Sequence, residues 1–132
     1  MKVNKMKSWK EVRDYITGNY GISDYDEDDD NITAEVFLKN GRTQTAVVTR
    51  REKMIVFGSV IGNINKNDIK DALCDLTECR YGRITCTDDG ECFVSHIEEL
   101  ENLSEENIDV ILKTVAVFAD EMEEKYICDD VY

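Results

Sequence analysis

The chain has 132 residues, 42% of them hydrophobic, and this length and composition favour a folded domain over a disordered chain. Its 16 basic and 29 acidic residues give a net charge of −13 at pH 7, which repels the phosphate backbone of nucleic acids. No apolar run matches a membrane span or a secretory signal, so we expect a single cytosolic domain over residues 1–132 that binds neither nucleic acid nor membrane.

The first half of the chain predicts a helix followed by a β-hairpin. Ser8 is a typical helix N-cap, and apolar residues recur at helical spacing after it. An acidic run then covers residues 24–30, which we expect to form a solvated loop. Apolar and polar residues alternate over 32–39, as in a half-buried strand. Asn40-Gly41 predicts a two-residue turn into a second strand over 42–50.

The two-residue turn also predicts which side chains share a face. It would place Val47 on the core face of the hairpin, and Phe37, Ala46 and Val48 on the opposite face. That opposite face is too apolar to be fully solvated, yet its charged neighbours make it too polar for a deep core. Partial cover by a helix and a protein interface both remain open.

The second half of the chain predicts a central strand, a short helix, a hairpin and a long helix. Residues 54–61 are apolar on both faces, as in a central strand. A short helix is expected after Asn65 or Asn67, and the segments 81–87 and 91–97 form a second hairpin. A final helix starts at Ser104 and carries the best apolar stripe of the chain: Ile108, Ile111, Leu112, Val115, Phe118, Ala119, Met122 and Tyr126. The predicted fold class is therefore α+β, an antiparallel sheet with the order α-β-β-β-α-β-β-α.

Two short motifs resemble the YbjN-type proteins. They are Gly41-Arg42-Thr43-Gln44 at the second strand and the run from Val115 to Glu123 in the last helix. A small acidic protein with this order of elements also looks like the type III secretion chaperones, which share the fold. The resemblance implies a secretion-chaperone-like sheet, a tendency to form homodimers, and binding of another polypeptide without catalysis.

The sequence contains no strong enzyme or metal motif. Patterns for nucleotide binding, nucleophilic hydrolysis and zinc hydrolysis are absent, so we expect no catalytic residues and no cofactor. Counting Asp24 as the first position of a calcium loop puts Glu35 at the twelfth. However, Asp29 stands where the sharp turn needs glycine, and a strand follows instead of a helix. We therefore expect no ordered metal site in the acidic run.

The cysteines predict free thiols, mostly small core residues. They are odd in number, irregularly spaced and without a CxxC pair: Cys74, Cys79, Cys86, Cys92 and Cys128. A three-residue loop at 88–90 would set Cys86 opposite Cys92, whereas a two-residue loop at 89–90 would separate them. His96 lies near this pair, but three such ligands are one too few for a closed zinc site.

These patterns favour a protein-binding module. In this interpretation an edge strand and an exposed apolar surface capture an extended segment of a partner polypeptide. The residues expected to face the partner are Phe37, Ala46 and Val48, and in addition Trp9 and Tyr15. The alternative is an acidic inhibitor or immunity-type protein, in which residues 24–30 block a basic, nucleic-acid-binding site and binding falls with added salt.

Overall fold

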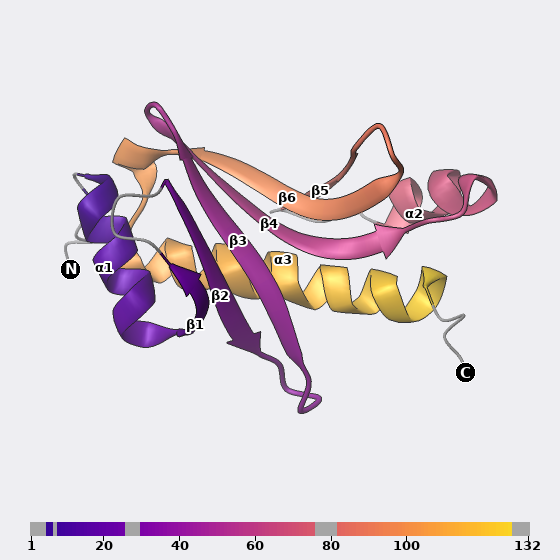
Figure 1. Cartoon of the computed structure of the whole chain (residues 1–132), viewed down its shortest axis with the longest axis horizontal. Helices are drawn as coiled ribbons and strands as arrows, with labels where there is room; N and C mark the ends of the chain where they lie inside the picture. Colours follow the sequence, from indigo (N-terminus) through magenta and orange to yellow (C-terminus); the bar gives the residue numbers. More distant parts are fainter. Residues whose placement is uncertain (1–4, 7, 26–29, 76–81, 128–132) are drawn as a thin grey trace.

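The computed structural model describes residues 5–6, 8–25, 30–75 and 82–127. In these ranges a six-stranded antiparallel sheet has the strand order β1-β2-β3-β4-β6-β5. The long helix α3 runs along one face of this sheet (Figure 1). The predicted α+β class and antiparallel sheet are therefore confirmed.

The elements follow the predicted order, with one additional strand. Their bounds are α1 Trp9–Asn19, β1 Gly21–Tyr25, β2 Asn31–Phe37, β3 Thr43–Arg51, β4 Met54–Asn63, α2 Ile69–Asp75, β5 Arg83–Cys86, β6 Glu91–Glu99 and α3 Glu105–Tyr126. Short 3₁₀ turns at Lys66–Asp68 and Leu100–Asn102 precede α2 and α3.

The additional strand, β1, corrects the prediction of a loop over 24–30. Asp24 and Tyr25 belong to β1, with their Cα atoms opposite Thr33 and Ile32 of β2. The reason is that pairing satisfies backbone groups of β2 that would otherwise form an open sheet edge, and the acidic composition does not prevent it. The middle of the acidic run, 26–29, lies outside the described residues.

Serine caps begin both long helices, as predicted. The Ser8 side chain accepts a hydrogen bond of 3.2 Å from the amide of Glu11. Ser104 and Asn107 form a reciprocal capping box, in which the amide of Ser104 donates to Asn107 Oδ1 at 2.6 Å and the amide of Asn107 donates to Ser104 Oγ at 3.2 Å. These local bonds satisfy backbone donors that a helix start leaves unpaired.

The core lies between α3 and the sheet. On α3 the predicted stripe is buried at Ile108, Ile111, Leu112, Val115, Ala119 and Met122, while Phe118 and Tyr126 are only partly buried. The facing strand β4 buries Ile55, Phe57 and Ile61. Each large side chain of this kind stabilises the fold by about 1.5–3 kcal/mol. Helix α3 is therefore the chief cover of the sheet.

The hairpin between β2 and β3 has a different register from the predicted one. The backbone amide of Leu38 donates to the carbonyl of Arg42 at 2.9 Å, so the loop is three residues long, 39–41. Gly41 has a φ of 88° whereas Asn40 does not have a positive φ, and the predicted two-residue turn needs it at both positions. The register consequently slips by one residue, and every side chain of β3 changes face.

The sheet divides into two arms beyond the middle of β3 and β4. Their pairing ends at Ala46 opposite Ser59, after which the β2–β3 hairpin and the β4–β6 pair diverge (Figure 1). Two side chains bridge the start of the opening. Gln44 Nε2 donates to the carbonyl of Val60 at 3.0 Å, and Ser59 Oγ donates to the carbonyl of Thr45 at 2.7 Å.

Among the described helices, we find none that is both long and apolar enough to cross a membrane.

Candidate functional site

Among the described residues, the most exposed large apolar side chain is Phe37, near the end of β2. It is 77% exposed, while its neighbours Val36 and Leu38 are buried on the core face. An aromatic ring left in water on a strand is unusual, because burial of such a ring is strongly favourable. Among the described large apolar residues, Phe37 is thus the one most open to contact with another molecule.

The backbone at Phe37 also lies on a free edge. Because Leu38 bonds to β3, strand alternation turns the amide and carbonyl of Phe37 the other way, toward the β1 side. Strand β1 pairs with β2 only as far as Gly21 opposite Glu35, so it ends before it reaches Phe37. A peptide in line with β1 would meet one donor and one acceptor here.

A surface hollow of about 290 Å³ adjoins this edge. It lies where α1 ends, β1 begins and α3 passes beneath β2. Its lining residues are Asn19, Tyr20, Gly21, Glu35, Val36, Phe37, Asp109 and Lys113. The hollow therefore offers apolar contact at Phe37 and charged groups of both signs, at Glu35, Asp109 and Lys113.

Two tyrosines bind Asp109, one of the residues that line the hollow. Tyr15 and Tyr20 both donate hydrogen bonds to the carboxylate of Asp109, at 2.7 and 2.6 Å. Burial and these bonds raise the pKa of Tyr15 to about 12, and for the same reasons raise the pKa of Tyr20. Both hydroxyls therefore remain protonated donors at neutral pH, and they fix the end of α1 against α3.

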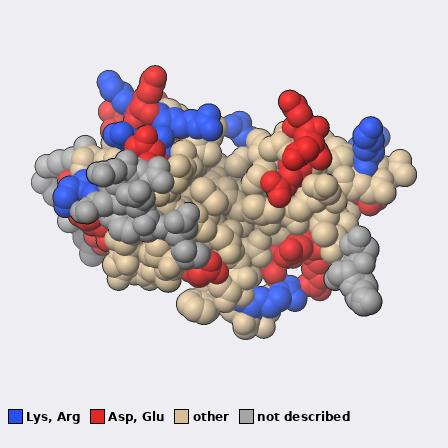
Figure 2. Space-filling model, viewed as in Figure 1, with Lys and Arg blue, Asp and Glu red and all other residues tan. Residues whose placement is uncertain are grey.

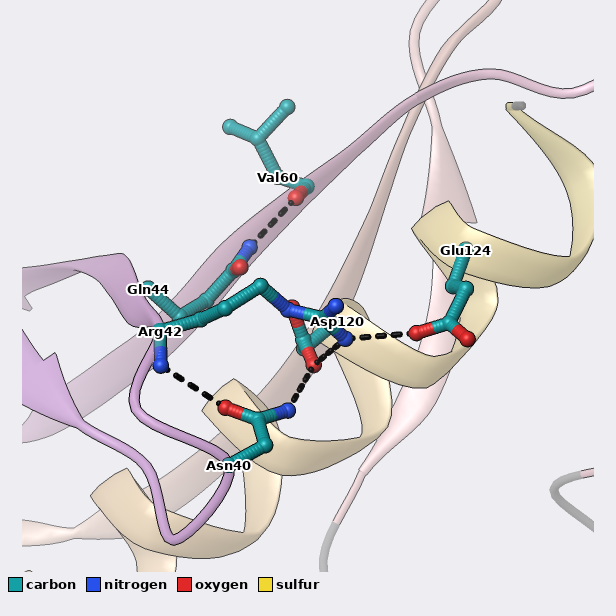
Figure 3. Close-up of polar contacts among 6 residues, drawn as sticks. All are labelled: Asn40, Arg42, Gln44, Val60, Asp120 and Glu124. Carbon is teal, nitrogen blue, oxygen red and sulfur yellow. Dashed lines mark hydrogen bonds and ion pairs between the residues drawn. The ribbon is translucent and has the colours of Figure 1, made fainter. Parts of the chain in front are cut away.

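A cluster of charged and polar side chains links the β2–β3 loop to α3 (Figure 3). The Arg42 guanidinium binds Asp120 of α3 with two hydrogen bonds, of 2.9 Å from Nε and 2.6 Å from an Nη atom. Asn40 Nδ2 donates to the same carboxylate at 3.0 Å, and Arg42 also binds Glu124 at 2.6 Å. The hydrogen bond from Arg42 holds the pKa of Asp120 below its usual range. Hairpin and helix are thus fastened beside Phe37 by charge-assisted bonds.

A second apolar surface lies on the sheet face opposite α3. Its side chains alternate with the core positions of β3, β4 and β6 and are partly exposed: Val47, Val56, Val60, Phe93 and Ile97. In Figure 1 β2 and β3 cross in front of α3, and Figure 2, seen from the same side, shows an area without Lys, Arg, Asp or Glu near the centre of the molecule. This open face is a candidate protein interface.

Three of the residues predicted to face a partner are instead in the core. Ala46 and Val48 are fully buried, because the shifted register turns them toward α3. Trp9 is also buried, on the face of α1 that meets the core. Tyr15 is partly buried and positions Asp109. Only Phe37 is placed as the sequence predicted, and its partner-binding role stays a prediction.

The acidic run shows no calcium-loop arrangement in its described part. Asp30 forms an ion pair of 3.0 Å with Arg50, and Glu35 lies on β2, where it accepts a hydrogen bond from Thr45 at 3.2 Å. Over the described ranges, no group of three or more His, Cys, Asp or Glu side chains is arranged to hold a metal ion. His96 instead lies 3.0 Å from Glu98.

Sequence reasoning missed the polar residues that shape the site. Tyr20 and Asp109 lie 89 positions apart in the chain. No local pattern connects them. The Arg42–Asp120 pair had a weak signal, since each residue belongs to one of the two short motifs that resemble YbjN-type proteins.

Comparison with known proteins identifies the fold. No protein-family model and no curated protein sequence matches the chain. Among solved structures, YbjN from E. coli has a TM-score of 0.59 and 7% identity, over 94% of this chain and 93% of that one. This chain has the secretion-chaperone-like fold shared with YbjN.

Two complexes contain similar chains. One is the HopA1–SchA chaperone–effector complex, with a TM-score of 0.57 and 8% identity over 74% of this chain and 78% of that one. The other is the heterodimeric ExoU–SpcU complex of the type III secretion system of Pseudomonas aeruginosa, with a TM-score of 0.55 and 10% identity over 70% and 82%. At these identities the likeness concerns the fold alone.

Proposed function

We propose that this protein is a non-enzymatic binding module, and that an extended segment of its partner pairs with the edge of β2 at Phe37. The observation that carries the proposal is the coincidence of an exposed aromatic ring, an unpaired strand edge and an adjoining hollow. In strand addition, backbone bonds supply affinity and side-chain pockets supply selectivity. The similar chains from two protein–protein complexes support this class of function.

The incoming segment would continue the line of β1, antiparallel to β2. Its backbone would bond to the amide and carbonyl of Phe37, and one side chain would enter the hollow beside Tyr20. The wall formed by Tyr20 and Asp109, and the fastening of Arg42 to Asp120, are already in place. A site built in advance loses little conformational entropy when it binds.

The test uses random peptides displayed on phage and selected on the wild-type protein. Selected peptides are then measured by calorimetry against Phe37→Ala and Phe37→Pro. Both variants lose the ring, but only proline also removes the outward amide, without removing a bond to β3. We expect Phe37→Pro to bind about tenfold more weakly than Phe37→Ala, the value of one hydrogen bond.

The matched control is Val110→Ala, which trims an exposed apolar side chain of α3 that does not line the hollow. It should bind like the wild type, and all variants should keep the wild-type melting temperature to within a few degrees. Equal binding by Phe37→Ala, Phe37→Pro and the wild type would reject the site. A loss of binding in high salt, with no effect of the Phe37 variants, would favour the acidic-inhibitor function instead.

We also propose that two copies of the chain associate through the open sheet face. A net charge of −13 opposes self-association in general, and the uncharged centre of this face is where the repulsion is weakest. Light-scattering chromatography should give about twice 15.2 kDa, and Val56→Glu, on that face, should give a folded monomer. A wild-type monomer at high micromolar concentration would contradict the dimer but leave the peptide site untouched.

A further inference from the structure

Two cysteines form a disulfide across the β5–β6 hairpin. Cys86 of β5 and Cys92 of β6 are directly opposite each other, with their Cα atoms 4.1 Å apart. The next pair outward is hydrogen-bonded, since the amide of Thr87 donates to the carbonyl of Glu91 at 2.8 Å. The cysteines therefore occupy a non-hydrogen-bonded position, where opposite residues come closest. This corrects the sequence expectation of free thiols at these two positions, because the loop at 88–90 has three residues and sets the cysteines opposite each other.

The two cysteines differ in their exposure to solvent. Cys92 is 1% exposed, whereas Cys86 lies exposed on the edge strand. Thiol–disulfide exchange needs a thiolate to reach one sulfur of the bond, and access decides which sulfur is attacked. An incoming thiol would therefore react at Cys86.

A small number of non-covalent contacts also hold β5 to the sheet. It is a four-residue edge strand whose partner in the described sheet is β6. Alternation from the Thr87–Glu91 pair leaves two further hydrogen-bonded pairs, Arg83 with Ser95 and Thr85 with Phe93. Only Ile84 packs from β5 against the core, and it is partly buried. The hydroxyls of Thr85 and Ser95 add one side-chain hydrogen bond of 3.3 Å. The disulfide therefore reinforces a short strand that few non-covalent contacts hold.

We propose that the Cys86–Cys92 bond is a reversible exchange site for low-molecular-weight thiols, and that its reduction releases β5 and bares the edge of β6. A thiolate RS⁻ attacks Cys86 Sγ and forms a mixed disulfide, while Cys92 leaves as a thiolate and takes up a proton. A second RS⁻ attacks the sulfur of the bound RS group and forms RSSR, while Cys86 leaves as a thiolate that takes up a proton. Two thiols are oxidised to one disulfide, and the protein disulfide is reduced to two thiols. The backbone groups of Phe93 and Ser95 then lose their partners on β5.

The test compares hydrogen exchange after equilibration in oxidised and in reduced glutathione. The amides of Phe93 and Ser95 should exchange on the order of 50-fold faster in the reduced form, the factor expected for loss of a short closed loop. Amides in the middle of α3, around Leu112, should exchange equally in both forms. Mass spectrometry after alkylation should find Cys86 and Cys92 blocked as a disulfide only in the oxidised sample.

Two variants serve as controls. Cys86→Ser, a small change at an exposed position, should exchange like the reduced form in either buffer. Cys74→Ser removes a free exposed thiol of α2 and should respond to glutathione like the wild type. The proposal would be overturned by equal exchange of Phe93 and Ser95 in the two buffers, or by alkylation of both Cys86 and Cys92 after treatment with oxidised glutathione.

Discussion

The fastening of the β2–β3 loop to α3 is best tested by changing Asp120 to Asn. The Asp120 side chain is 7% exposed and accepts bonds from Arg42 and Asn40, whereas the Arg42 side chain is 50% exposed. A hydrogen bond to a charged group contributes about 1.5–3 kcal/mol, and solvent at Arg42 screens part of it. We expect Asp120→Asn to lower the free energy of unfolding by about 1–3 kcal/mol, measured in urea by circular dichroism.

Glu124 provides a matched control on the same arginine. It binds the same Arg42 at 2.6 Å, but its side chain is 67% exposed, so Glu124→Gln should cost no more than about 0.5 kcal/mol. Asp120 differs from Glu124 in its burial and in its two additional hydrogen bonds, from Arg42 Nε and Asn40 Nδ2. Equal costs for the two substitutions, or a neutral Asp120→Asn, would refute this expectation.

The same pair predicts how stability depends on pH. The hydrogen bond from Arg42 lowers the pKa of Asp120 in the folded state, so the folded protein keeps this carboxylate charged where the unfolded chain takes up a proton. Its contribution is present above the unfolded pKa of about 3.9 and is lost as pH falls below that value through the folded pKa. The stability difference between the wild type and Asp120→Asn should therefore shrink on acidification. A difference that stays constant down to the acid transition would contradict this.

Three further predictions concern the core, the tyrosine pair and the acidic run. Leu112→Ala should cost about 2–5 kcal/mol in urea unfolding and Val110→Ala less than about 0.5, and similar values would mean that the stripe on α3 is not core. Tyr20→Phe should cost about 1 kcal/mol through the lost bond to Asp109, and an unchanged stability would show that this bond does not hold α1. Millimolar calcium should leave the melting temperature unchanged, and a rise of several degrees, removed by Asn substitutions in 24–30, would reinstate a metal loop.

The alternating residues of β3 favour the observed register of the first hairpin over the predicted one. The even positions of β3 offer Gln44, Ala46 and Val48 to the core, whereas the odd positions offer a single valine among threonines. Burying the even face therefore removes more apolar surface from water, even though Gln44 must then find a partner, the carbonyl of Val60. The Asn40-Gly41 pair pointed to the wrong loop length, because a three-residue loop also accepts glycine at its last position.

The sequence by itself determined the features that depend on near neighbours. Ser8 and Ser104 start helices through bonds within a turn, and the apolar stripe of α3 repeats at a period that any helix would present to a core. Only the tertiary structure decided the rest: that part of the acidic run becomes β1, and that Tyr20 meets Asp109 and Arg42 meets Asp120, 89 and 78 positions away. Such contacts depend on how α1 and the β2–β3 loop pack on α3, and no local pattern records that packing. The candidate site is built from these contacts, so the sequence predicted the ring of Phe37 but not the surroundings that make it a site.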